Sequence, residues 1–128
     1  MNSKISILKY GTGNLHSIER ALKHFGFEAE FVQTTKEILN ANRLILPGIG
    51  ASKYVMDYLS ASERSHAVSE LVSRGRPVLG ICLGMQILLS ESHEFGFHQG
   101  LNIIPGKVES LKALSVDITV PHMGWSET

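Results

Sequence analysis

A single cysteine is flanked by glycines at a spacing that suits nucleophilic chemistry. Cys82 lies at the centre of Gly80-Ile81-Cys82-Leu83-Gly84, after an apolar run and before residues that favour a helix. A tight strand-to-helix turn leaves no room for side chains two residues before and after its central residue, which explains both glycines. Such a turn exposes the cysteine at a helix N-terminus, where the dipole favours the thiolate. We therefore predict that Cys82 is a nucleophile, in preference to the inert buried thiol that is common for a lone cysteine.

A nucleophile that attacks a carbonyl carbon also needs donors for the oxyanion that forms. The backbone N–H of Leu83 is free to face this oxyanion. A second N–H is predicted from Pro47-Gly48-Ile49-Gly50, because two glycines around one residue let a peptide plane turn over with little steric penalty. The same segment is equally compatible with an ordinary Pro-Gly loop.

Other kinds of chemistry find little support in the sequence. The chain has six histidines, but no pair has H-x-x-x-H spacing, so we expect no metal site. None of the histidines is placed as a convincing base for Cys82. Gly11-Thr12-Gly13 begins like a dinucleotide fingerprint, but His16 stands where the third glycine belongs, and we expect no cofactor.

The elements that position these residues follow from hydrophobic patterns. Buried strands are predicted at 5–8, 43–46 and 77–81. At 27–33, Phe27, Ala29 and Phe31 alternate with Glu28, Glu30 and Val32, which predicts a strand with one more solvated face. Helices are predicted at 15–25, from Thr35, at 52–59, 63–74 and 83–89, then a loop at 91–100 and strands at 103–109 and 116–120. This alternation predicts an α/β fold, a mostly parallel sheet with helices on both faces. In such sheets chemistry gathers at the carboxyl ends of the strands.

Composition limits the class of protein further. A chain of 128 residues corresponds to one domain. Twelve basic residues balance twelve acidic ones, so we expect no general electrostatic attraction to nucleic acid or to an anionic membrane. No signal peptide and no apolar run long enough to span a membrane are present, and one cysteine excludes an internal disulfide. These features predict a cytoplasmic protein.

Four segments resemble a known family. Residues 80–86, Gly-Ile-Cys-Leu-Gly-Met-Gln, resemble the nucleophile motif of the class I (triad) glutamine amidotransferases. Three more, 10–15, 46–51 and 120–125, are similar to the glutaminase subunits of imidazole glycerol phosphate synthases, and the Pro-His-Met-Gly-Trp of 121–125 is the most specific. The resemblance runs through the whole chain in order. It implies a flavodoxin-like fold.

The resemblance also implies a reaction and a partner. Cys82 would attack the carboxamide of glutamine, form a thioester and release ammonia, while Gln86 helps to bind the substrate. The oxyanion would be held by Leu83 and the segment Gly48, Ile49 and Gly50. Ammonia would pass to a (βα)₈-barrel cyclase, the partner in a heterodimer, which makes imidazole glycerol phosphate in histidine biosynthesis. The partner would contact Asn14 and the segment Pro121, His122, Met123, Gly124 and Trp125.

The sequence departs from the family pattern at three places. Lys9 stands where the family usually has Asp, and Ser126 where it has Asn. The His-Pro-Glu motif that completes the family triad does not occur before Thr128. We therefore expect residues 1–128 to be the N-terminal part of a longer domain, to lack glutaminase activity by themselves, and to depend on a base beyond Thr128.

Three other functions fit parts of the pattern. One is a sibling glutaminase subunit of another synthase, such as one that aminates a sugar of a surface polysaccharide. Another is the related peptidase-like and glyoxalase-like cysteine family, which typically has histidine where this chain has Leu83. The last is a non-catalytic docking subunit that keeps the fold and the interface.

Overall fold

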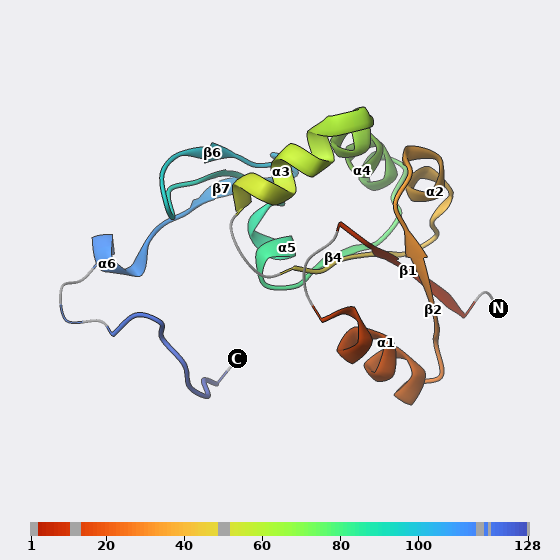
Figure 1. Cartoon of the computed structure of the whole chain (residues 1–128), viewed down its shortest axis with the longest axis horizontal. Coiled ribbons are helices and arrows are strands. Elements are labelled where there is room, and N and C mark those ends of the chain that lie inside the picture. The colour runs from red at the N-terminus through yellow and green to blue at the C-terminus, as the bar shows by residue number, and fades with distance from the viewer. Residues whose placement is uncertain (1–2, 11–13, 49–51, 115–116, 118, 128) are drawn as a thin grey trace.

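The main sheet consists of four parallel strands in the order β2-β1-β3-β4. The computed structural model describes residues 3–10, 14–48, 52–114, 117 and 119–127 (Figure 1). The strands are β1 Lys4–Leu8, β2 Glu28–Val32, β3 Leu44–Leu46 and β4 Val78–Gly80. Strands that are consecutive in the chain are joined by helical crossovers, as parallel pairing requires. The predicted α/β fold with a mostly parallel, flavodoxin-like sheet is confirmed.

Helices cover both faces of this sheet. Helix α1 (Leu15–His24) lies on one side, and α2 (Thr35–Asn40), α3 (Ser52–Ser60) and α4 (Arg64–Ser73) lie on the other (Figure 1). A 3₁₀ turn at Ala61–Glu63 joins α3 to α4. The main core fills the side of the three helices and is built from the buried residues Leu8, Val32, Leu44, Leu46, Val55, Leu59, Val68 and Leu71. Removing such side chains from water is the main term that stabilises the domain.

The face below α1 is only partly covered. Strand register aligns Phe31, Ile7, Ile45 and Leu79 in one row across the four strands. The inner two are buried, whereas Phe31 is 38% and Leu79 is 57% exposed. Helix α1 therefore shields the centre of this face and leaves the row open at β4. The prediction that the strand at 77–81 is buried was wrong, because no described element covers this side of β4.

Three phenylalanines near the edge of the sheet are not buried. Phe25, the last residue of the helix predicted at 15–25, is 74% exposed because it lies past the last turn of α1. In β2 the buried residue is Val32 and not Phe27 or Phe31. The side chain of Val32 points to the face that α2 to α4 cover, so the packed helices, and not the alternation in the strand, decide which residue is buried.

Capping residues lie at the ends of the first two helices. The Asn14 side chain caps α1 by accepting a hydrogen bond from the Ser17 N–H, and Gly26 follows the helix with φ of +80°. Thr34 and Glu37 form a capping box at α2: the Thr34 hydroxyl accepts from the Glu37 N–H, and the Glu37 carboxylate accepts from the Thr34 N–H.

The capping box should make stability depend on pH. Hydrogen bonds from the backbone N–H groups of Gln33 and Thr34 hold the pKa of Glu37 below its ordinary value of 4.5. A lowered pKa in the folded state stabilises the protein above the unfolded value, and this contribution disappears as pH falls through the folded value. We expect Glu37→Gln to lower the melting temperature at about pH 7 but not below about pH 3. An equal difference at both pH values would contradict this account.

A second, smaller sheet follows Cys82. Helix α5 covers only Leu83–Gln86, and the chain then forms β5 (Leu89–Ser92), β6 (His98–Gln99) and β7 (Ile104–Val108) in the order β6-β5-β7. The predicted helix to residue 89 and the predicted loop at 91–100 were therefore wrong. The carbonyl groups of Ile87 and Leu88 accept hydrogen bonds from residues 101, 103 and 104, and so do not continue a helix. The predicted strand at 103–109 is confirmed as β7.

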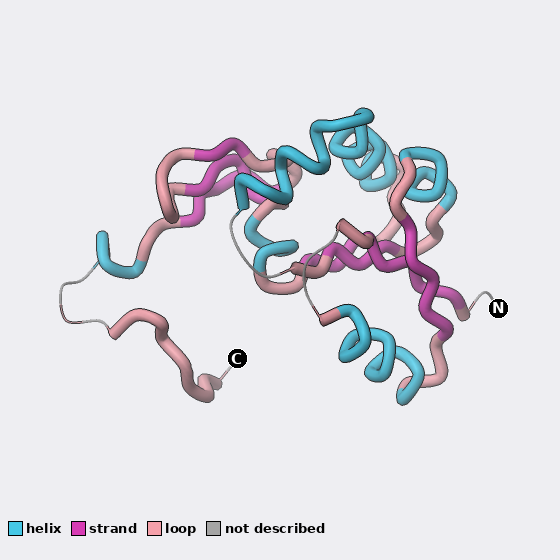
Figure 2. The backbone as a smooth tube through the Cα atoms, viewed as in Figure 1, coloured by secondary structure: helices cyan, strands magenta, loops and turns pink. Residues whose placement is uncertain are grey.

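The last part of the chain differs from the prediction of a strand at 116–120. A short helix, α6 (Leu111–Leu114), precedes it, and Asp117, Thr119 and Val120 lie in no strand; residues 115, 116 and 118 are outside the described residues. Figure 2 shows residues 119–127 as a loop. A strand needs a neighbour to pair with, and among the described residues none lies along this segment. No helix in the described ranges has the length and apolar character that crossing a membrane requires.

Candidate active site

Three adjacent strands end at the same edge of the sheet and carry the candidate site. Tyr10 follows β1, Pro47 and Gly48 follow β3, and Cys82 follows β4. Because β3 is paired with both β1 and β4, the residues after these strands are neighbours in space. The structure therefore brings Cys82 and Gly48 together at the sheet edge where the sequence predicts chemistry. It also places Tyr10 at this edge.

Cys82 has an unusual backbone conformation. Its φ is +53° and its ψ is −114°, and its thiol is free and exposed. The N–H of Ile81 still donates to the Leu46 carbonyl of β3, at 2.9 Å, so the sheet continues to the residue before Cys82. Positive φ is strained for a residue with a side chain and is concentrated at functional sites. The strand–turn–helix context predicted around Cys82 is present, and the nucleophilic role of its sulfur stays a prediction.

The two glycines around Cys82 avoid steric clashes with different parts of the backbone. A Cβ atom on Gly80 would lie 2.6 Å from the carbonyl oxygen of Gly84 and from the backbone of Met85. A Cβ atom on Gly84 would overlap the backbone carbonyl of Leu46 in β3. The predicted crowding across the turn thus explains Gly80, whereas Gly84 is required because α5 starts directly against the neighbouring strand. Helix α5 has a single turn, so its dipole adds less to thiolate stability than the sequence led us to expect.

The structure describes two of the four residues predicted to hold the oxyanion. The Leu83 side chain is buried, and among the described residues its backbone N–H donates to no other backbone group. Gly48 is buried with φ of +147°, a conformation that favours glycine. Ile49 and Gly50 lie outside the described residues. Gln86, the predicted substrate-binding residue, is half-buried at the end of α5.

Tyr10 is a member of this edge that the sequence analysis missed. Its side chain is 1% exposed, and its ring packs against Tyr58 with centroids 5.9 Å apart. Within the described part of the chain its hydroxyl has no hydrogen-bond partner. Burial, and secondly the charge of Cys82, raise the pKa of Tyr10 above its ordinary range, so the hydroxyl stays protonated. The signal that could have found it is its position, since it follows a buried strand at the carboxyl end of the sheet.

No described histidine serves Cys82 as a hydrogen-bonded base. His16 and His93 bond to the carboxylates of Glu19 and Glu91, and His98 contacts the carbonyl oxygen of Phe95. This agrees with the difficulty of assigning a base from the sequence. In the same described ranges, no three His, Cys, Asp or Glu side chains are grouped so that they could hold a metal ion.

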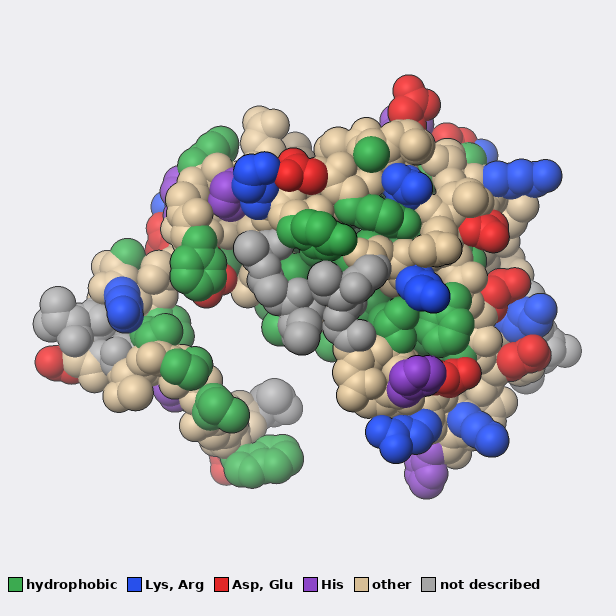
Figure 3. Space-filling model, in the orientation of Figure 1, with side chains coloured by type: hydrophobic (Ala, Val, Ile, Leu, Met, Phe, Trp, Pro, Cys, Tyr) green, Lys and Arg blue, Asp and Glu red, His purple; other side chains and the backbone are tan. Residues whose placement is uncertain are grey.

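The residues predicted to contact a partner are at the surface. Asn14 is exposed and caps α1. All five residues of the segment 121–125 are exposed, and Met123 and Trp125 are almost completely so. Figure 3 shows hydrophobic side chains along this C-terminal segment. The structure does not place the segment against the turn at Cys82, and its role in an interface stays a prediction.

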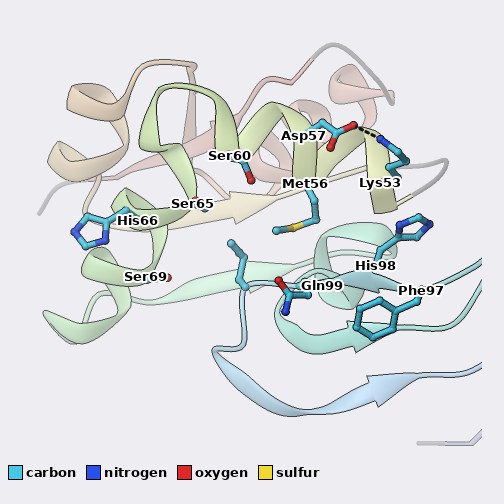
Figure 4. A pocket seen from close by; sticks show the side chains of 12 residues that line it. Lys53, Met56, Asp57, Ser60, Ser65, His66, Ser69, Phe97, His98 and Gln99 are labelled. Atoms are coloured by element: carbon cyan, nitrogen blue, oxygen red, sulfur yellow. Dashed lines mark hydrogen bonds and ion pairs between the residues drawn. The ribbon is translucent and has the colours of Figure 1, made fainter.

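A cavity of about 680 Å³ lies elsewhere on the molecule. Figure 4 shows it between α3, α4 and the segment 97–101, with the Lys53–Asp57 ion pair of 2.7 Å on its rim. It contains none of the residues predicted for the site, and most of its polar side chains are exposed. The candidate site is therefore the edge at Cys82 and not this cavity.

Comparison with known proteins identifies the family. The model of the class-I glutamine amidotransferases matches residues 6–126. The chain belongs to this family. Its Cys82 turn, the neighbouring Gly48 and the parallel sheet are thus features of a class I glutamine amidotransferase chain.

Similar curated proteins carry related names. The chain is 42% identical to imidazole glycerol phosphate synthase subunit HisH of Geobacter sulfurreducens, covering 98% of this chain and 62% of that protein. It is 44% identical to subunit HisH 1 of Legionella pneumophila strain Lens, covering 60% of it, and 46% identical to the chloroplastic imidazole glycerol phosphate synthase hisHF of Arabidopsis thaliana, covering 21%. The chain thus spans about three fifths of the length of the two HisH subunits.

Solved structures support the fold of this amidotransferase chain. A crystal structure described as a glutamine amidotransferase superposes with a TM-score of 0.71 at 24% identity, covering 82% of this chain and 55% of that one. A putative peptidase E from Listeria monocytogenes EGD-e superposes with a TM-score of 0.69 at 12% identity, covering 79% and 62%. At these identities the likeness concerns the fold alone.

Proposed function

We propose that this chain provides the glutaminase nucleophile of an imidazole glycerol phosphate synthase. Cys82, held at positive φ after β4 with its thiol exposed, is the observation that carries the proposal. Membership of the class I glutamine amidotransferase family supports the choice of a carboxamide as the group attacked. The HisH names of relatives at 42–46% identity support this synthase over other users of ammonia.

The reaction follows from the chemistry of a thiolate. The Cys82 sulfur attacks the side-chain carboxamide carbon of glutamine, and the carbonyl oxygen becomes an oxyanion. The N–H of Leu83 and an N–H of the segment 48–50 hold this oxyanion, and Gln86 helps to hold the substrate. The C–N bond then breaks, and ammonia leaves after gaining a proton. Water attacks the thioester and releases glutamate and the free thiol.

The proton transfers need a general acid and base. The described histidines that form hydrogen bonds use other partners, as shown above. The family resemblance assigns this role to the histidine of a His-Pro-Glu motif, and we adopt that assignment.

The ammonia is proposed to pass to a (βα)₈-barrel cyclase. Asn14 and the segment 121–125 supply the contact surface of this heterodimer. Exposed aromatic and methionine side chains, such as Trp125 and Met123, are favourable when a partner buries them, because such residues contribute strongly to binding.

A sibling glutaminase subunit of another synthase is the second candidate. Lys9 and Ser126, the two departures from the family pattern, are both exposed. Surface positions are where a different partner would be recognised. The chemistry at Cys82 is the same in both proposals, and only the acceptor of ammonia differs.

A reactive glutamine analogue tests the glutaminase proposal. A diazoketone with the chain length of glutamine should alkylate Cys82, the only cysteine of the chain, and free glutamine should protect it. The matched control is the analogue that is one methylene shorter, with the length of asparagine. Mass spectrometry locates the adduct. Equal labelling by both analogues, or labelling that glutamine does not slow, would show that Cys82 is an ordinary exposed thiol.

A further inference from the structure

We propose that Tyr10 is a positioning residue of the glutaminase site, whose buried hydroxyl contacts Gly48 and fixes the start of the segment that holds the oxyanion. In this role Tyr10 acts through Gly48 and not through the thiol or the substrate. The inference rests on the proposed function, because it takes the segment that begins at Gly48 as a source of an oxyanion donor.

The strand register places Gly48 between Tyr10 and the nucleophile. Strand β1 pairs with β3 so that positions 7 and 45 are neighbours, and β3 pairs with β4 so that positions 46 and 80 are neighbours. Continuing these pairs past the strand ends brings positions 10, 48 and 82 into one row. A group on β1 that limits the position of Gly48 therefore also limits where this backbone lies beside Cys82.

The Tyr10 hydroxyl makes the closest approach to Gly48. A Cβ atom on Gly48 would lie 2.7 Å from the phenol oxygen, and 3.2 and 3.4 Å from the ring carbons Cε2 and Cζ. The space in which any other residue carries its Cβ atom is thus occupied by the hydroxyl. The oxygen of Tyr10 therefore sets how close residue 48 can come to the end of β1.

Neighbouring groups prevent the phenol of Tyr10 from moving aside. Its ring is 1% exposed and packs against Tyr58, with centroids 5.9 Å apart. The Tyr58 hydroxyl donates to the Lys9 carbonyl at 3.1 Å, and the guanidinium carbon of Arg64 lies 4.2 Å from the centroid of the Tyr58 ring. Arg64 is itself fixed, since its Nε donates to the Gln33 carbonyl at 2.7 Å. In a packed interior such a chain of contacts makes the hydroxyl a rigid support.

The hydroxyl is the part of Tyr10 that packing does not explain. Within the described part of the chain it has no hydrogen-bond partner. A buried hydroxyl without a partner destabilises a fold, and phenylalanine would fill the space of the ring without that penalty. Phenylalanine would not reach Gly48 in the same way. We therefore expect the hydroxyl to contribute to the position of Gly48 and not to stability.

Tyr10→Phe separates these two contributions. In the full-length protein with its cyclase, we expect this variant to lower kcat for glutamine hydrolysis about tenfold, which is less than the roughly 10²- to 10³-fold loss for a missing oxyanion donor. KM for glutamine should not change, because the oxyanion forms only in the transition state. The rate of Cys82 alkylation by iodoacetamide should also not change, and the melting temperature should stay equal or rise. Tyr54→Phe is the matched control, since Tyr54 is 53% exposed, and it should leave kcat unchanged.

A variant at Gly48 tests the contact itself. Gly48→Ala would bring a methyl group against the phenol oxygen, at a position whose φ of +147° already favours glycine. We expect kcat to fall about 10²-fold, the cost typical of a misplaced reacting geometry. Adding Tyr10→Phe to Gly48→Ala removes the closest atom and should recover about tenfold, because residues in contact do not behave additively. The same change would then lower kcat in one background and raise it in the other.

The kinetic results distinguish this inference from the proposed function. Equal kcat in Tyr10→Phe and the unchanged protein would overturn the inference, and so would losses that simply add in the double variant. A parallel fall in kcat and melting temperature would reduce Tyr10 to a structural role and also overturn it. If the unchanged full-length protein hydrolyses no glutamine, the proposed function fails and this inference fails with it. If it hydrolyses glutamine and Tyr10→Phe behaves identically, only this inference fails.

Discussion

In the full-length protein, replacing Cys82 by alanine should abolish glutamine-dependent synthesis and leave ammonia-dependent synthesis intact. The thiolate makes the bond to the carboxamide carbon in the proposed reaction, and no other cysteine is present in the chain to replace it. Loss of a covalent nucleophile lowers turnover by about 10⁴-fold or more. The assay measures formation of imidazole glycerol phosphate with the cyclase partner, first with glutamine and then with added ammonium salt.

The matched control for this variant is Cys82→Ser, which keeps the size of the side chain. Serine is a far weaker nucleophile at neutral pH, so this variant should also fail with glutamine while it still binds the partner. Glutamine-dependent synthesis by Cys82→Ala at the unchanged rate would refute the assignment of the nucleophile. Loss of both glutamine- and ammonia-dependent synthesis would instead place Cys82 in the contact with the cyclase.

Gly84→Ala should strongly destabilise the fold. The new Cβ atom would overlap the backbone carbonyl of Leu46. Because the group it meets is backbone and not a flexible side chain, the clash cannot be relieved by a change of rotamer. Overpacking of a rigid site typically destabilises by about 1–3 kcal/mol, and we expect a value at or above the top of that range here. Thermal or urea unfolding measures it. Activity should fall in parallel, because α5 cannot keep its place against β3.

Gly75→Ala provides the comparison for the glycine test. Gly75 has φ of +75° but no atom within 4 Å of the added Cβ position, so its replacement introduces backbone strain without a clash. We expect Gly75→Ala to destabilise by about 1–2 kcal/mol, clearly less than Gly84→Ala. If Gly84→Ala were as stable as Gly75→Ala, α5 would not lie as close to β3 in the protein as this structure places it.

The sequence was sufficient for the parallel sheet and for the turn at Cys82. Parallel strands are short apolar runs, and those at β1, β3 and β4 are bounded by glycine, proline or polar residues that end them. The caps at Asn14 and at Thr34 with Glu37 are local signals, and each acts within one turn of helix. Such features can be predicted because neighbours in the chain determine them.

Features that depend on distant parts of the chain could not be predicted in the same way. Leu83–Leu89 has the composition of a helix, yet the carbonyls of Ile87 and Leu88 accept hydrogen bonds from the backbone N–H groups of residues 101, 103 and 104. The role of Gly84 comes from Leu46, a residue of another strand. Tyr10 was overlooked because one tyrosine beside two glycines has no periodic pattern, and only the strand order shows that it lies at the same edge of the sheet as Cys82.

The strand order also has a consequence for the folding reaction. Every pair in the main sheet is parallel, so each pairing must close a long loop before it is stabilised, and such topologies fold slowly. The strand before Cys82 is the outermost, and Leu44 pairs with Val78 only after α3 and α4 have bridged them. Tyr10, Gly48 and Cys82 therefore come together late, when three separate crossovers are complete. A nascent or partly folded chain would not yet hold Cys82 at positive φ after β4, so this backbone conformation of the cysteine is a property of the finished domain.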